Sequence, residues 1–339
     1  MLTLPFRPAF LAVPLLLVLA PASDELAFHP KADTELAKTL ALELEVALDD
    51  FSLEVNGQEL GKDSIQGLDG MGVVLHVNVG TTDKYVKCAD GKIVELLRTF
   101  DELTLKTEMG DESKEDADLG AFAGKTARFN WDAEKKEYVK SWVEAKADDE
   151  ALAGLHPDAD ITCLLPDAKV KEGDTWKVKG EALTGLFFPG GMFPAGAEED
   201  SGSNVDGEAL LAELEKKLQA LEVTCTYKGA HEDGKKELGE IAFQFDGSVE
   251  LDLAKLIEEA IAEDAEEMPD FEMKSSMKMK GEGTLLWDVA AGHLHSMKMN
   301  ADLGLSIDAT AHMDQEGQSL DIKAHFAASG KGDWSLAVK

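Results

Sequence analysis

Apolar and polar side chains alternate with a period of two residues between Phe271 and Ile307. The polar residues, which include Lys278, Lys280 and Lys298, occupy even positions. Because successive side chains of a β-strand point to opposite faces of a sheet, this pattern predicts two long strands joined by a turn at Trp287–Leu294. A slip of one residue would place the methionine row beside the lysine row, so we predict that odd positions pair with odd positions. The apolar odd positions include Met277, Met279, Leu285, Trp287, Met297 and Met299.

The same alternation recurs in other parts of the chain. From Leu40 to Leu48 the even positions are apolar, and Asn56–Gly57 then marks a turn. Further strands are predicted at 73–79, 85–88, 93–100, 103–109, 127–131, 138–143, 223–227, 241–253, 320–326 and 334–338.

Two stretches have helical periodicity instead. Leucines recur at helical spacing in Leu210–Leu221, and Leu253–Glu266 has one apolar and one acidic face before Pro269. Together with the strands, they predict an α+β fold. We expect mainly antiparallel β-meander sheets, half-barrel or sandwich-like, with two or three amphipathic helices.

The first 22 residues have the features of a signal peptide. Arg7 precedes an apolar run, and small residues at Ala20 and Ala22 suit cleavage after Ala22. The run is shorter than the roughly 20 residues that span a bilayer. We therefore predict an exported protein, periplasmic or secreted, with no transmembrane anchor after cleavage.

A segment rich in glycine, proline and acidic residues interrupts the alternation at 185–206. This segment predicts a linker or loop between an N-terminal β-rich half at 23–184 and a C-terminal α+β half at 207–339.

The chain is strongly acidic, with 67 Asp and Glu residues against 33 Lys and Arg residues and a net charge of −34. Such a charge repels phosphate backbones and anionic lipid surfaces. It therefore excludes nucleic acid as a partner.

The sequence carries no recognisable catalytic motif. Its cysteines, Cys88, Cys163 and Cys225, lie far apart without zinc spacing, and at most one disulfide can form among them. Nucleophile-elbow, zinc-protease, phosphate-loop and dinucleotide motifs are absent in the required context. We predict that the protein is not an enzyme, with an acid-residue hydrolase as the least favoured alternative, and the sequence identifies no cofactor.

One short motif carries a resemblance. Leu165–Pro166 followed by Gly173–Asp174 and Trp176 resembles the LP…GD-x-W step of uncharacterised exported bacterial β-rich proteins. The resemblance covers some fifteen residues and implies a surface turn leading into a strand, with Trp176 packed inward. The predicted architecture is also similar to that of half-barrel lipid carriers of the bacterial envelope, at the level of fold alone.

Two groups of residues are candidates for binding an apolar ligand. The first is the odd face of 271–307, which would line a pocket for a lipid-like molecule with Met277, Met279, Leu285, Trp287, Met297 and Met299. The second is the loop with Phe187, Phe188 and Phe193, which would form a lid over that pocket or a contact with a partner. Alternatively, this loop folds back onto the core.

A third group suits a metal ion. His293, His295, Met297 and Met299 occupy alternate positions of one strand, and imidazole with thioether sulfur suits Cu(I). The competing interpretation is an ordinary buried strand face, because methionine is a flexible core residue.

These observations favour an exported acidic binding protein that holds a lipid-like apolar molecule. The alternative is a structural or interaction protein of the cell envelope without a ligand pocket, which would bind another envelope protein. Periplasmic copper binding through the His/Met strand face comes third.

Overall fold

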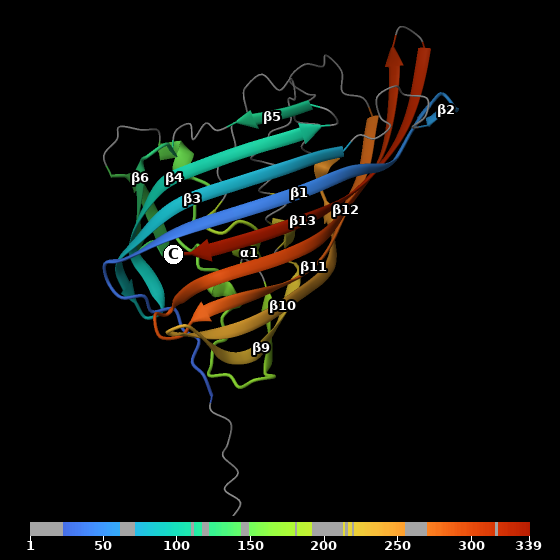
Figure 1. The fold of residues 1–339 in the computed structure, drawn as a ribbon. Helices are drawn as coiled ribbons and strands as arrows, with labels where there is room; N and C mark the ends of the chain where they lie inside the picture. Colours follow the sequence, from blue (N-terminus) through green and yellow to red (C-terminus); the bar gives the residue numbers. More distant parts are fainter. Residues whose placement is uncertain are drawn as a thin grey trace, which may run out of the picture.

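The computed structural model describes residues 23–61, 72–109, 112–116, 122–143, 149–179, 182–191, 213, 216–218, 220–254, 270–315 and 318–339. The strands are β1 (Thr34–Val55), β2 (Gln58–Gly61), β3 (Gly72–Ala89), β4 (Lys92–Met109), β5 (Glu112–Asp116), β6 (Thr126–Asp132), β7 (Glu137–Trp142), β8 (Thr175–Lys179), β9 (Glu222–Asp233), β10 (Lys236–Leu251), β11 (Asp270–Asp288), β12 (His293–Gln315) and β13 (Gln318–Val338). They form one antiparallel 13-stranded sheet in the order β7-β6-β4-β3-β1-β13-β12-β11-β10-β9-β8, with β2 added to β1 and β5 to β4 (Figure 1).

The predicted α+β fold with two or three amphipathic helices is wrong, because the structure is 71% strand and 7% helix and is nearly all-β. The helical elements with assigned bounds are α1 (Ala182–Phe187) and the 3-10 turns η3 (Asp149–Leu152) and η4 (Thr162–Leu164). Most of Leu210–Leu221 and of Leu253–Glu266 lies outside the described residues, and residues 213, 216–218 and 253–254 of these two stretches are helical. Strands dominate the structure because the alternating stretches are long: β1, β11, β12 and β13 have 19 to 23 residues each.

The predicted pairing of odd with odd positions in the long hairpin is confirmed. Met279 lies opposite Leu303, and Leu285 lies opposite Met297. The register shifts between Leu286 and Trp287, so that Trp287 pairs with Leu294. The odd positions of both strands therefore share one face of the sheet, which we call the inner face.

A second irregularity keeps the apolar side of β1 on the inner face over its whole length. The register against β13 shifts between Leu48 and Asp50. A bulge adds one residue, so the inward positions change from even to odd, as the apolar residues of the sequence do at Phe51, Leu53 and Val55. The strand ends at the predicted turn, where Asn56 and Gly57 both have positive φ.

The chain crosses the inner face between the two ends of the sheet. It leaves β7 at one end and enters β8 at the other, and residues 149–174 between them form what we call the crossing segment. Its Leu152, Leu155, Ile161 and Leu164 are buried in the same core as the inward side chains of the sheet. The sheet is thus covered from inside by its own connection.

The crossing segment ends at the predicted turn. Gly173 has a φ of 90°, β8 begins at Thr175, and the indole of Trp176 packs on the core and donates a hydrogen bond to the carbonyl oxygen of Leu164 at 3.1 Å. The turn into a strand with an inward tryptophan is therefore confirmed.

Strands from both sides of the predicted boundary at 185–206 belong to the same sheet, since β1 pairs with β13 along most of its length. Residues 192–206 of that boundary and the predicted signal peptide at 1–22 lie outside the described residues.

Glycines on the inner face lie beneath aromatic rings. A Cβ atom added to Gly283 would lie 2.3 Å from Cζ of Phe243 and 2.4 Å from the carbonyl oxygen of Lys298, and one added to Gly281 would lie 2.4 Å from Cζ of Phe245. Because the Lys298 carbonyl belongs to the sheet backbone, it is not free to move away.

We therefore expect Gly283→Ala to lower the free energy of unfolding by about 1–3 kcal/mol. Gly304→Ala is the matched control, since its added Cβ would meet only Cβ of Lys278 at 3.9 Å, and we expect it to be neutral or slightly stabilising. Urea unfolding measures both. Equal stabilities of the two variants would contradict the packing described above.

Candidate functional site

The inner face has two parts, which we call proximal and distal. The proximal part contains Met279, Leu285, Trp287, Met297 and Met299 from the predicted ligand pocket, all at most 4% exposed. They pack in the core together with residues of the crossing segment. In this part the predicted pocket residues meet protein side chains. Of the predicted set, Met277 alone is only half-buried, and it lies at the start of the distal part.

The predicted lid residues differ in how deeply they are buried. Phe187 at the end of α1 is buried, and its ring lies 5.4 Å from that of Phe245 and 6.0 Å from that of Trp334. Phe188 is partly buried against the same core, and Phe193 lies outside the described residues. The described part of this loop folds back onto the core.

The predicted copper ligands are placed differently from one another. His293 is buried, with Nδ1 hydrogen-bonded to the carbonyl oxygen of Leu294 at 2.7 Å. The register shift leaves His295 without a cross-strand partner, whereas Met297 and Met299 lie in the core. Burial and the nearby Lys236 lower the pKa of His295. No group of three or more His, Cys, Asp or Glu side chains suited to a metal occurs among the described residues.

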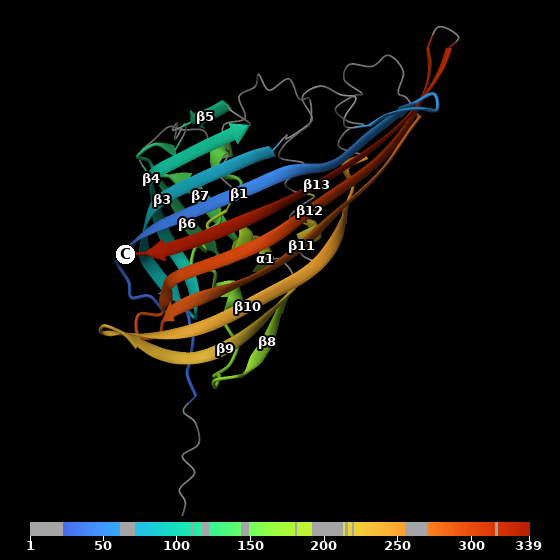
Figure 2. The ribbon, with the colours of Figure 1, turned by 45° about the vertical axis from the view of Figure 1, so that its right-hand side comes forward.

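The strands β1, β11, β12 and β13 extend beyond β3 and β9 (Figure 2). The inward side chains at the far ends of these four strands form what we call the distal inner face. They are half-buried and stand in cross-strand rows, for example Phe51 opposite Phe326 and Phe326 opposite Ile307. The residues of this face are Phe51, Leu53, Val55, Ile322, Ala324, Phe326, Leu305, Ile307, Ala309, Ala311, Met273 and Met277.

The opposite face of the same strands is charged. Lys323 pairs with Glu54 at 2.7 Å, and Nδ1 of His325 lies 2.8 Å from Asp308. The far ends of these strands are therefore amphipathic, with half-buried apolar side chains on one side and exposed ion pairs on the other. The sequence carries this signal in the alternation of 320–326 and in the changed parity of Phe51, Leu53 and Val55.

The most strongly perturbed titratable groups form a closed ion cluster. Arg98 is paired with Asp83 through Nε at 2.6 Å and Nη2 at 2.8 Å. The ammonium of Lys38 lies 2.9 Å from Asp160 and 3.1 Å from Asp83, and Tyr85 donates to Asp160. Sequence analysis missed this cluster, although Lys38 is a charged residue at an inward even position of β1.

The ion cluster holds the crossing segment against the sheet. Arg98 also donates to the carbonyl oxygens of His156 at 2.8 Å, Pro157 at 3.0 Å and Gly190 at 3.2 Å. Asp160 belongs to the crossing segment, and its Oδ1 accepts a hydrogen bond from the backbone of Leu294 in β12 at 3.2 Å. The cluster is therefore closed to a substrate and acts as a structural clamp.

Burial and charge shift the pKa values of this cluster in opposite directions. Burial disfavours ionised Asp83, but Arg98 and Lys38 outweigh it and hold the pKa of Asp83 below its usual value. Burial likewise disfavours charged Lys38, but Asp160 and Asp83 raise its pKa. Each group thus remains charged because its partners are present.

The cysteines lack the environment of a nucleophile. Burial raises the pKa of Cys225 to about 12, and burial together with Asp160 raises that of Cys88 to about 11. Burial, Asp158 and Cys225 raise the pKa of Cys163 as well. The thiols therefore stay protonated near neutral pH.

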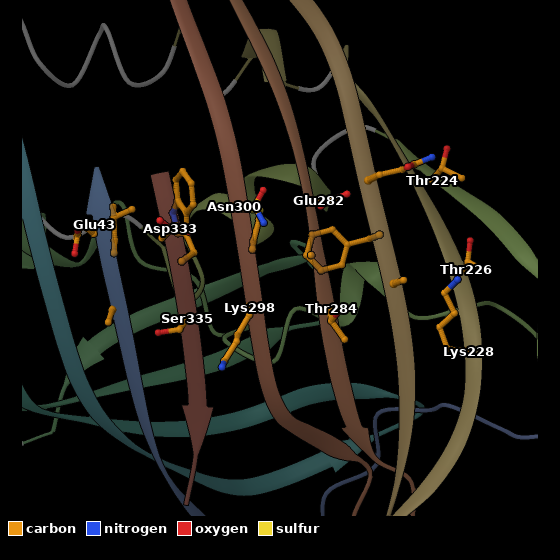
Figure 3. Close-up of a pocket in the computed structure, with 18 of the residues that line it drawn as sticks. Glu43, Thr224, Thr226, Lys228, Glu282, Thr284, Lys298, Asn300, Asp333 and Ser335 are labelled. Carbon is orange, nitrogen blue, oxygen red and sulfur yellow. The ribbon is translucent and has the colours of Figure 1, made fainter. Parts of the chain in front are cut away.

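A depression of about 770 Å³, which we call the outer trough, lies on the outer face of the sheet. Figure 3 shows labelled side chains of neighbouring strands side by side, in rows that cross the strands. The first row contains Glu43, Asp333, Asn300 and Glu282, and the second contains Ser335, Lys298 and Thr284. The sequence predicted Lys298 only as one of the polar even positions of its strand, because it does not reveal which distant strands become neighbours.

The comparisons with known proteins leave the family open. No family model and no curated protein matches the chain. Among solved structures, OmpT, an outer membrane protein of Vibrio cholerae, aligns at 10% identity over 91% of this chain and 100% of its own, with a TM-score of 0.14. A score this low carries no argument. None of the helices in the described ranges is long and apolar enough to cross a membrane.

The ion cluster generates a test by substitution. We expect Asp83→Asn to lower the free energy of unfolding by about 3–5 kcal/mol at pH 7, because it leaves buried Arg98 without its carboxylate. The pKa of Asp83 is held below 3.8, so its contribution is present above about pH 4 and disappears as the pH falls through the lowered pKa. The difference between the two proteins should shrink in acid.

Urea unfolding at several pH values measures this difference. Lys323→Met, which breaks an exposed ion pair with Glu54, is the control and should leave the midpoint unchanged. An Asp83→Asn protein as stable as the wild type at pH 7 would refute the clamp.

Proposed function

We propose that the protein is an exported, non-catalytic binding protein that holds a lipid-like apolar molecule against the distal inner face. The observation that supports this proposal most strongly is that apolar side chains of four adjacent strands lie opposite one another on that face and remain half-buried. Apolar surface that leaves water gains about 25 cal/mol per Å². A contiguous half-buried patch of this kind therefore favours a bound apolar partner.

The dimensions and charge of the face favour an acyl chain. From Leu305 to Ala311 the strand β12 rises roughly 20 Å at ~3.4 Å per residue, which exceeds half of the ~30 Å hydrocarbon thickness of a bilayer, the depth that one acyl chain fills. The inward residues of β12 over this stretch are apolar. The net charge of −34 disfavours an anionic headgroup. We therefore infer a neutral or zwitterionic lipid.

Two further observations support binding rather than catalysis. The ion cluster is sealed inside the core, and the three thiols have raised pKa values. Export is inferred from the signal-peptide features of residues 1–22.

The test uses two cross-strand pairs that differ only in the face they occupy. Ile307 lies opposite Phe326 on the distal inner face, and the next pair, Asp308 and His325, lies on the outer face. The probe is a phosphatidylcholine with a fluorescent acyl chain. We expect saturable binding to the mature wild-type protein and at least tenfold weaker binding to Ile307→Gln/Phe326→Gln.

Asp308→Asn/His325→Gln is the matched control and should bind as the wild type does. Circular dichroism melting checks that both double variants are folded. If the wild type fails to bind, or if the inner-face variant binds equally well, the proposal is wrong, and a structural protein that packs this face on an envelope partner becomes the better account.

A further inference from the structure

The outer trough lies on the face opposite to the proposed lipid site, so it is a separate surface. Cross-strand pairing builds it: Glu43 lies opposite Asp333, Asp333 opposite Asn300, and Asn300 opposite Glu282, which in turn lies opposite Gln244. The parallel row contains Lys298 between Ser335 and Thr284 on the neighbouring strands (Figure 3).

The central polar groups of the trough have no partners within the part of the chain that the structure describes. The side chains of Asn300, Glu282 and Lys298 make neither a hydrogen bond nor an ion pair there. Some outer-face groups are paired: Lys323 contacts Glu54 at 2.7 Å at the far ends of the strands, and within the trough His76 lies 3.4 Å from Glu43. The trough thus offers unused donors and acceptors in a fixed array on a rigid sheet.

The order of charges in the trough selects the class of ligand. A polycation bound in the trough would lie against the ammonium of Lys298 and be repelled by it. A polyanion would lie against the carboxylates of Asp333 and Glu282, on a chain whose net charge is −34. A neutral polyhydroxylated chain meets neither conflict. Its hydroxyl groups donate to the carboxylates and accept from lysine, and amide side chains such as Asn300 do both.

We propose that the outer trough binds a neutral linear oligosaccharide that lies across the strands. From β1 to β9 the trough spans five strand spacings, roughly 24 Å at ~4.8 Å each. Its volume of about 770 Å³ lies within the range of small-molecule sites, about 300–1,000 Å³. Because open hydrogen bonds to neutral groups contribute modestly, the expected Kd is about 0.1–1 mM.

Isothermal titration calorimetry of the mature protein with cellohexaose and chitohexaose tests this proposal. We expect at least one of the two sugars to bind, and Asn300→Ala/Glu282→Ala to raise its Kd at least tenfold. Asp308→Asn/His325→Gln, on the outer face beyond the trough, should leave the Kd unchanged. Both substituted trough positions are exposed, so the variant should remain folded, and melting curves check this.

Other outcomes overturn the proposal. These are binding of neither sugar, an unchanged Kd in the trough variant, or binding of spermine or polyglutamate in their place. Binding of the phosphatidylcholine probe should be the same in the trough variant and in the wild type, so the result is independent of the proposed lipid site.

Discussion

Arg98 makes a bidentate ion pair with Asp83 inside the protein and donates to the carbonyl oxygens of His156 and Pro157 in the crossing segment. These contacts join the crossing segment to the sheet. Lys38 of β1 makes a further contact between them, because its ammonium donates a hydrogen bond to the carboxylate of Asp160. Separating such buried charges is costly, so the segment remains on the proximal inner face. The proximal part becomes a packed core, and the distal part of the same strands retains half-buried apolar side chains. The division of the inner face, and with it the proposed lipid site, depends on this clamp.

The two proposed sites follow from one property of β-strands, the alternation of side chains between faces. Ile307 and Phe326 point inward to the apolar surface, whereas Asn300 and Glu282 point outward into the trough. The bulge after Leu48 keeps the two faces separate along β1. It moves the inward side chains from even to odd positions at the point where the apolar residues of the sequence also move from even to odd positions. A single sheet thereby offers a different surface to each of the two proposed ligands.

Sequence alone predicted the elements that local pattern determines. The alternation of 271–307 predicted the pairing of Leu285 with Met297, and Asn56–Gly57 predicted the turn after β1. The predicted fold class was wrong, because long alternating strands make up 71% of the structure and helices only 7%. The ion cluster and the outer trough needed the strand order, since Lys38 meets Asp160 and Glu43 meets Asp333 only after distant segments pair. The placement of Met297 and Met299 in the core depended on the crossing segment, whose path has no periodic signal.

Native mass spectrometry of the protein, purified from the cells that produce it, tests the central claim most directly. Mild desolvation should give the mass of the protein plus a bound neutral or zwitterionic lipid, which denaturation then releases for identification. The Ile307→Gln/Phe326→Gln protein, prepared in the same way, should appear mainly without that added mass. A wild-type protein that carries no lipid, or a lipid equally retained by the inner-face variant, would contradict the account.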